Sequence, residues 1–156
     1  MSQGWPREGG IAVEKSVELL EFKIGNQSLA FDVDAVEMVI EAPETTVVPG
    51  APDFVKGVIN LRGRIVTVID LASILALDIG ERPPDQILVL KVDGEELGIP
   101  VHGVDEVFTV DISEIGTPVS RSERYLNKVK GIIKRKDRLI LYLDVNKILN
   151  MDEKEG

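Results

Sequence analysis

The sequence predicts an all-β fold, mainly strands with short helices, arranged as two β-barrels of about five short strands each. The apolar residues are mostly Val, Ile and Leu, which suit half-buried pleated surfaces, and they occur in runs of strand length. Turn residues interrupt these runs at short intervals, which favours barrels over units that alternate strands with helices. The second half of the chain also repeats the pattern of the first, so one barrel is expected for each half.

The first half begins after a polar, glycine-bearing stretch, residues 1–15, which predicts a flexible N-terminal tail. Apolar runs then predict strands at residues 17–24, 28–33 and 36–40, with Gly25-Asn26 as the first turn. The loop that follows carries three prolines, which cannot donate hydrogen bonds to a strand ladder. This half therefore supplies three short strands and a loop before its central hairpin.

The central hairpin is the best-formed local structure in the sequence. Two runs rich in Val and Ile, residues 55–61 and 64–69, flank the two-residue turn Arg62-Gly63. Gly63 can supply the positive φ that such a turn needs, so a charged Arg62 is expected at the tip of a rigid hairpin. Asp70 then stands at the N-cap position of a short helix.

The pattern returns after residues 80–85, which contain a glycine and two prolines. Strands expected at residues 87–92, 97–101 and 104–107 correspond to those of the first half at an offset of 68 residues. Residues 129–149 match the hairpin and helix at an offset of 74, with eight of 21 positions identical. The sequence thus predicts a first barrel over residues 16–84, a second over residues 85–150, and a charged tail at residues 151–156.

The hairpin tips differ between the two copies although their strands agree. Asn60-Leu61-Arg62-Gly63 in the first copy becomes Lys134-Arg135-Lys136-Asp137 in the second. A surface that diverges between two copies of one fold is a candidate for a specific function.

Charge and composition exclude several classes of protein. The net charge of −9 argues against a nucleic-acid binder, and the absence of cysteine excludes disulfides and thiolate metal sites. No apolar run approaches the roughly 18–20 residues needed to span a bilayer, and no secretory signal is visible at the N-terminus. We therefore expect a cytoplasmic protein.

The sequence contains no recognisable arrangement of catalytic residues. The sequence has no nucleophile elbow, no phosphate-binding glycine loop and no dinucleotide fingerprint. His102 is the only histidine and is expected to be a half-exposed barrel residue, and the acidic pairs Glu95-Glu96 and Asp105-Glu106 are expected to be solvated. We predict no catalytic residue, no bound metal and no cofactor.

A binding role has more support than a catalytic one, because the central hairpin is apolar on both faces. One face should fill its own barrel, and the other should pack on the second barrel or leave a groove for a partner's helix along the seam. Arg62 would then stand at the rim of that groove, or else be a free solvated arginine. Alternation along each strand assigns Val55, Ile59, Leu61, Ile65, Thr67 and Ile69 to one face and Val58, Val66 and Val68 to the other.

The run Gly57-Val58-Ile59-Asn60-Leu61-Arg62-Gly63, followed by Val66-x-Val68-Ile69-Asp70-Leu71, resembles the signature of the CheW family of bacterial chemotaxis coupling proteins. The resemblance extends from about Val17 to Asn150 and includes Phe31-Asp32-Val33, Gly98-Ile99-x-Val101 and Tyr125-Leu126. It implies one CheW-like domain made of two intertwined SH3-like barrels, and a non-enzymatic adaptor.

The resemblance also implies the partners of the chain. Members of the family join the cytoplasmic helical tip of chemoreceptors to the regulatory domain of the histidine kinase CheA. We therefore expect no nucleic acid, contact with the membrane only indirectly through receptors, and recruitment from the cytoplasm to membrane receptor arrays. The positions that match the family's receptor groove, or border it, are Val36, Met38, Gly57, Val58, Arg62, Gly63 and Val107.

Two positions depart from the family pattern. An acid is common at the position of Met38, and aspartate is common at the position of His102. These changes bear on partner specificity and leave the expected fold unaltered. The alternative function is a stand-alone regulatory domain that acts directly on a kinase or phosphatase, and a small-barrel nucleic-acid binder is disfavoured by charge and by the scarcity of aromatic residues.

Overall fold

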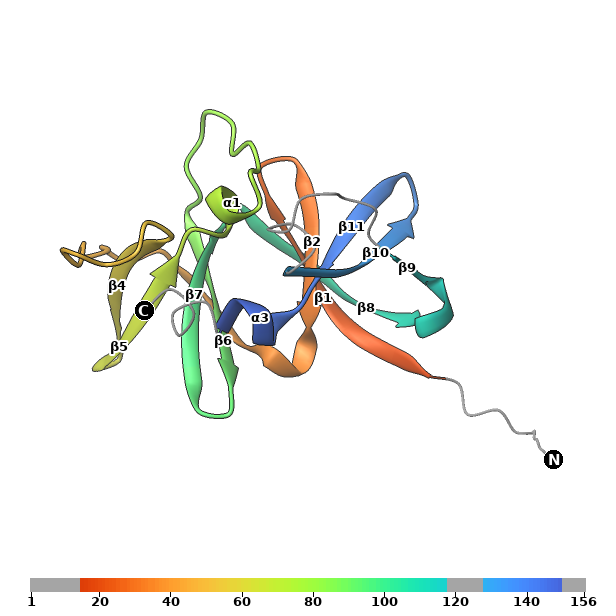
Figure 1. The fold of residues 1–156 in the computed structure, drawn as a ribbon, viewed down its shortest axis with the longest axis horizontal. Helices are drawn as coiled ribbons and strands as arrows, with labels where there is room; N and C mark the ends of the chain where they lie inside the picture. The colour runs from red at the N-terminus through yellow and green to blue at the C-terminus, as the bar shows by residue number, and fades with distance from the viewer. Residues whose placement is uncertain (1–14, 118–127, 150–156) are drawn as a thin grey trace.

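The computed structural model describes residues 15–117 and 128–149, and over these residues it confirms a mainly β fold with two sheets (Figure 1). The N-terminal tail expected at residues 1–15, apart from Lys15, lies outside the described residues, as do the charged tail at 151–156 and the Tyr125-Leu126 pair. No helix in the described part of the chain is long and apolar enough to cross a membrane.

The first sheet has the strand order β8-β1-β2-β11-β10-β9, and the second has the order β3-β6-β7-β5-β4. The strands of the first sheet are β1 (Ser16–Ile24), β2 (Gln27–Asp32), β8 (Gly103–Asp111), β9 (Ile115–Gly116), β10 (Val129–Arg135) and β11 (Arg138–Leu143). Those of the second are β3 (Val36–Glu41), β4 (Val55–Leu61), β5 (Arg64–Ile69), β6 (Gln86–Val92) and β7 (Glu95–Val101). The short helices in the described part of the chain are η1 (Val33–Ala35), α1 (Leu71–Ile74), η2 (Ile112–Glu114) and α3 (Val145–Leu149).

The two sheets repeat each other strand by strand. The offsets of 68 and 74 residues relate β1, β2, β3, β4 and β5 to β6, β7, β8, β10 and β11 in turn. When each strand is replaced by its counterpart in the other repeat, the order β8-β1-β2-β11-β10 becomes β3-β6-β7-β5-β4. This is the order observed in the second sheet. Each sheet also contains one parallel pair, β2 with β11 and β5 with β7, at corresponding places. The internal repeat is therefore a repeat of structure.

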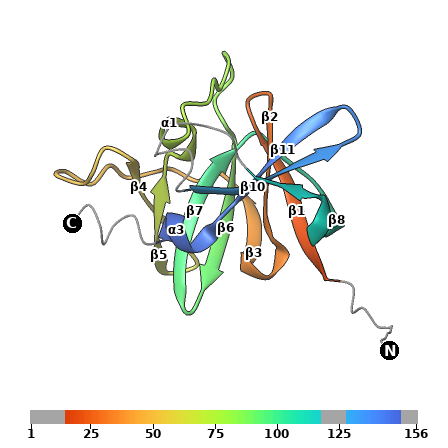
Figure 2. The same cartoon turned by 45° about the vertical axis from the view of Figure 1, so that its right-hand side comes forward.

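The sheets do not follow the two halves of the sequence. Strands β1 and β2 of the first half pair with β8 and β11 of the second, and β3 pairs with β6. The division after residue 84 consequently marks the repeat in the sequence and is not a boundary between sheets. The chain crosses from the first sheet to the second through η1 and returns between β7 and β8 (Figures 1 and 2).

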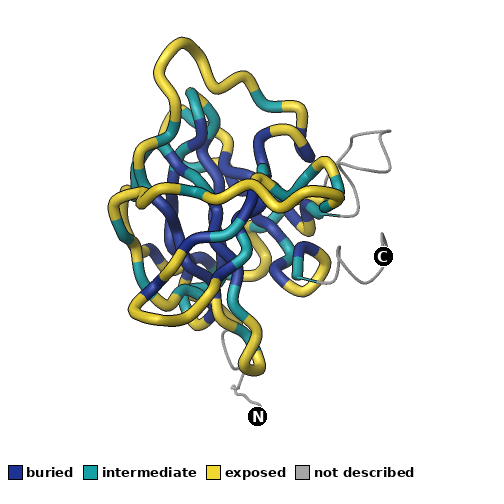
Figure 3. The backbone as a smooth tube through the Cα atoms, turned by 90° about the vertical axis from the view of Figure 1, so that its left-hand side faces the viewer, coloured by how far each residue is buried: buried dark blue, intermediate teal, exposed yellow. Residues whose placement is uncertain are grey.

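Within residues 15–117 and 128–149, three apolar clusters hold these layers together. The largest contains residues of both sheets and of helices α1 and α3, and includes the stacked rings of Phe22 and Phe31, whose centroids are 5.2 Å apart. Two smaller clusters belong one to each sheet, around Phe108 in the first and Ile59 in the second. Figure 3 shows the buried residues towards the middle of the molecule and the exposed ones mainly around its outside. Burial of both sheet faces explains why the sequence is apolar on both sides of its strands.

Candidate functional site

The tip of the β4–β5 hairpin is a two-residue turn with positive φ at both positions. Arg62 has a φ of 54° and Gly63 a φ of 87°, the combination of a type I′ turn, which matches the twist of the flanking strands. The side-chain Oδ1 of Asn60 accepts the Gly63 N–H at 2.9 Å. The positive φ predicted for Gly63 is confirmed, and Arg62 shares it. The turn therefore presents Arg62 at a defined, exposed position.

The neighbouring arginine is anchored within the chain. Arg64 Nε and Nη2 donate to the two carboxylate oxygens of Glu96 on β7 at 3.1 and 2.7 Å, and Glu37 on β3 lies 3.7 Å away. Hydrogen bonds from Arg64 lower the pKa of the Glu96 carboxyl. The expectation that Glu96 is simply solvated is therefore wrong. Arg62, by contrast, has no hydrogen bond or ion pair with any described residue.

The assignment of residues to the two hairpin faces from the sequence was wrong. The two-residue turn pairs Leu61 with Arg64, so Ile59 faces Val66 and does not share a face with Ile65. Ile59, Leu61, Val66 and Val68 together fill the small cluster of the second sheet. Ile65 is 66% exposed on the opposite face, next to the tip.

Gly57 and Val58 lie on β4 where a loop crosses it. Val58 and Thr46 exchange both backbone N–H···O bonds at 2.9 Å, which brings the loop against the strand. Gly57 is buried with a φ of 151°, and a Cβ atom there would overlap the carbonyl oxygen of Thr46. Only glycine fits this close approach without strain.

The other three predicted site residues lie on two further strands. Val36 and Met38 are on β3, at the opposite edge of the second sheet from β4, and Val107 is on β8 of the first sheet. A bulge between Val36 and Met38 turns them to different surroundings. Val36 packs on the large core, Met38 packs on the cluster around Ile59, and Val107 is 49% exposed. Four of the seven predicted residues thus share one hairpin, and the other three lie on β3 and β8.

Comparison of the two repeats explains the environment of Met38. Its counterpart in the first sheet is Glu106, whose carboxylate accepts from Arg135 Nη2 at 2.6 Å. The counterpart of Arg135 in the second sheet is Leu61, which is buried in the cluster that Met38 contacts. Two apolar side chains of one cluster in the second sheet therefore correspond to an ion pair in the first.

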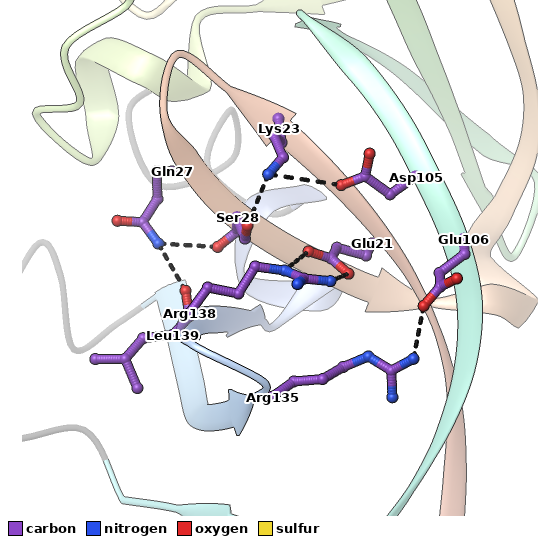
Figure 4. Close-up of polar contacts among 9 residues, drawn as sticks. All are labelled: Glu21, Lys23, Gln27, Ser28, Asp105, Glu106, Arg135, Arg138 and Leu139. Carbon is purple, nitrogen blue, oxygen red and sulfur yellow. Dashed lines mark hydrogen bonds and ion pairs between the residues drawn. The ribbon is translucent and has the colours of Figure 1, made fainter.

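The first sheet carries a polar network that sequence reasoning missed (Figure 4). Glu21 on β1 is fully buried, and Arg138 Nε and Nη2 donate to its two oxygens at 2.7 and 2.8 Å. These hydrogen bonds lower the pKa of the Glu21 carboxyl although burial opposes the change. Arg135 also lies over the Phe108 ring, 4.6 Å from its centroid. The counterpart of Glu21 in the second sheet is the apolar Val89. This difference between the repeats is the feature of the sequence that could have indicated the polar network.

Asp70, His102 and possible metal-ligating side chains were also considered from the sequence. Asp70 is the N-cap of α1 and its carboxylate accepts the Ser73 N–H at 3.2 Å, as predicted. His102 is half-buried, and both ring nitrogens form hydrogen bonds. Among the described residues, no group of three or more His, Cys, Asp or Glu side chains is placed to hold a metal ion.

Comparison with known proteins finds a family match over nearly the whole chain. The CheW-like domain family matches residues 18–153. The "Chemotaxis protein CheW" of Thermotoga maritima is 42% identical over 143 residues, which cover 91% of this chain and 94% of that protein. The protein of the same name from Bacillus subtilis is 27% identical, covering 92% of this chain and 94% of that protein.

A solved structure agrees with the fold. The crystal structure of scaffolding protein TtCheW from Thermoanaerobacter tengcongensis superposes with a TM-score of 0.72 and 28% sequence identity. The superposition covers 83% of this chain and 90% of that protein. The likeness therefore extends to both sheets.

Proposed function

This chain belongs to the CheW-like domain family, and we propose that it is a non-enzymatic adaptor that couples chemoreceptors to the histidine kinase CheA in chemotaxis. The observation that carries this proposal is the 42% identity to a chemotaxis protein CheW over nine-tenths of both chains. In the finer form of the proposal, the chain binds the cytoplasmic helical tip of the receptor and the regulatory domain of the kinase. It acts in the cytoplasm and is recruited to membrane receptor arrays by these two contacts.

The β4–β5 hairpin is the part of the receptor site that the geometry supports best. Arg62 is exposed, held by a type I′ turn and unpaired among the described residues, so its charge is available to a partner. The exposed Ile65 lies on the outer face beside it. A rigid cation next to an exposed aliphatic side chain fits an amphipathic helix that carries an acidic residue.

The wider site is a proposal that adds residues of both sheets to the hairpin. Val36, Met38, Gly57, Val58, Gly63 and Val107 are the further positions, and they are assigned by their match to the family's motif. Gly57 and Gly63 would act by shaping the backbone, since neither has a side chain to offer. Met38 would give this site an apolar patch where an acid is common in the family.

We expect Arg62→Ala to weaken binding of a purified receptor-tip fragment about tenfold, because it removes the charge that would pair with an acidic residue of the receptor helix. Calorimetry on the folded variant measures the dissociation constant, and a thermal melt verifies folding. Lys136→Ala is the matched control, because Lys136 occupies the corresponding turn position of the second hairpin with a φ of 60°. Equal affinities of wild type and Arg62→Ala would remove Arg62 from the receptor site.

A kinase assay separates the adaptor from a domain that regulates an enzyme directly. An adaptor changes kinase activity only when receptor and kinase are both present. A change in kinase activity on adding this chain without receptor would instead support the stand-alone regulatory function.

A further inference from the structure

His102 is the single residue between β7 of the second sheet and β8 of the first. Its backbone N–H donates to the carbonyl oxygen of Lys23 on β1 at 2.8 Å, which fixes the crossing chain against the first sheet. Its ring is half-buried and extends between two segments that are far apart in the sequence. These are the β1–β2 turn and the connection from α1 to β6, residues 75–85.

The two ring nitrogens of His102 have opposite hydrogen-bonding roles. Nδ1 lies 2.8 Å from the backbone nitrogen of Gly25, whose N–H can only donate, so Nδ1 must accept. Nε2 lies 2.7 Å from the carbonyl oxygen of Arg82, which can only accept, so Nε2 must donate. Only the neutral ring with its proton on Nε2 satisfies both contacts.

We propose that His102 is a proton-sensitive latch that holds the α1–β6 connection against the β1–β2 turn. Proton uptake at Nδ1 places an N–H opposite the Gly25 N–H, so the Gly25 bond breaks while the Arg82 bond can persist. Histidine is the side chain whose charge ordinarily changes between about pH 5 and 8, so this is the range over which the latch is tested.

The surroundings of the ring offer the protonated form another partner. A cavity of about 490 Å³ beside His102 is lined by Glu41 and Asp85, and Arg82 pairs with Asp85 at 3.5 Å. On the other side, Lys23 lies 3.9 Å from Asp105 at the start of β8. An imidazolium released from Gly25 can therefore turn towards carboxylates. The remaining charged groups of the connection are Asp78, whose carboxylate accepts the Gly80 N–H, and Glu81.

The β1–β2 turn is built for close contact with this connection. Gly25 has a φ of 61°, and a Cβ atom there would overlap the carbonyl oxygen of Asp78. The turn and the connection thus touch directly at Gly25, and the His102 ring joins them a second time. Loss of the ring's hydrogen bond to Gly25 removes this second junction, so we expect the connection to open locally while the sheets stay packed through the large core.

Amide hydrogen exchange measured by NMR on the full chain tests the latch. In wild type, we expect the protection factor of the Gly25 amide to fall about three- to tenfold between about pH 8 and about pH 5. His102→Asn places an amide oxygen near the position of Nδ1 and should make Gly25 protection independent of pH. His102→Gln places its amide nitrogen near Nε2, and should leave Gly25 poorly protected at both pH values.

Gly94, in the corresponding turn between β6 and β7, is the internal control and should show no such change. Thermal melts verify that both variants fold. A wild-type Gly25 protection factor that is the same at both pH values would overturn the proposal. So would a pH dependence in His102→Asn equal to that of wild type, or full Gly25 protection in His102→Gln.

Discussion

Gly57→Ala is expected to lower the free energy of unfolding by about 3 kcal/mol or more. Two costs combine at this position. The φ of 151° is unfavourable for any residue with a Cβ atom, and the new methyl group would overlap the Thr46 carbonyl oxygen. The backbone of Thr46 cannot move away without breaking its two hydrogen bonds to Val58. Urea unfolding followed by circular dichroism measures the loss.

Two other glycines provide matched controls for Gly57→Ala. A Cβ atom at Gly103 would meet no other atom within 4 Å, so Gly103→Ala should change stability by less than about 0.5 kcal/mol. Gly131 is the counterpart of Gly57 in β10, but its φ is not positive, and its Cβ atom would overlap a side-chain methyl group of Ile115 and not a backbone carbonyl oxygen. Gly131→Ala should therefore cost less than Gly57→Ala. Equal stabilities of Gly57→Ala and Gly103→Ala would contradict the close approach of Thr46 to β4.

Arg138→Ala is expected to destabilise the fold by about 3 kcal/mol at neutral pH, because it leaves the buried Glu21 carboxylate without its partner. Glu21→Val should cost less, since valine occupies the corresponding position in the second sheet and the Arg138 side chain, 28% exposed, can reach water. The double variant should be more stable than the sum of the two losses indicates. Urea unfolding of the four proteins measures this coupling, and additive losses would contradict a direct pair.

The Glu21–Arg138 pair also sets a pH dependence. The pKa of Glu21 is lowered in the folded chain, so the unfolded chain binds more protons in the acid range. The pair therefore contributes its full stability above the ordinary glutamate pKa, about 4.3, and loses that contribution as the pH falls through the lower, folded value.

Acid unfolding of Glu21→Val should accordingly show a weaker loss of stability below about pH 4 than wild type. The lowered pKa values of Glu96, Glu106 and Asp111 act in the same direction and remain in the variant. Arg138→Ala should behave differently, because burial alone raises the Glu21 pKa and protonation then relieves the unpaired charge. Its deficit relative to wild type should shrink as the pH falls.

Local patterns in the sequence predicted the strands of the two repeats and the hairpin tip, but they missed the short strand β9 and the helices η1 and η2. The Arg62-Gly63 turn and the Asp70 cap both depend on contacts within a few residues, which local sequence specifies. The internal repeat then indicated that the two sheets would be alike. The resemblance to the CheW family indicated that the two halves of the chain would be intertwined.

These local patterns could not predict which strands that are distant in the sequence would pair. The parallel pairing of β2 with β11 joins Ser28 to Ile140, and no periodicity indicates which distant strands will be neighbours. The partnership of Glu21 with Arg138 depends on that arrangement and was missed with it. The faces of the hairpin were assigned wrongly because alternation was counted along each strand without the offset that a two-residue turn imposes.

The role of His102 was missed for a similar reason. Its two ring contacts, with Gly25 and Arg82, involve segments 77 and 20 residues away in the sequence. Its position at the end of a strand correctly indicated partial burial. The bridging of two segments becomes visible only when the sheets are assembled.

Simultaneous binding of two partners is the measurement that tests the adaptor proposal most directly. The chain, saturated with the regulatory domain of the kinase, is titrated with a purified receptor-tip fragment, and complex mass is followed by analytical ultracentrifugation. We expect a ternary complex, with NMR shifts caused by the receptor fragment centred on the β4–β5 hairpin around Arg62. Displacement of the kinase domain by the receptor fragment, or receptor-induced shifts that leave this hairpin unperturbed, would contradict the account.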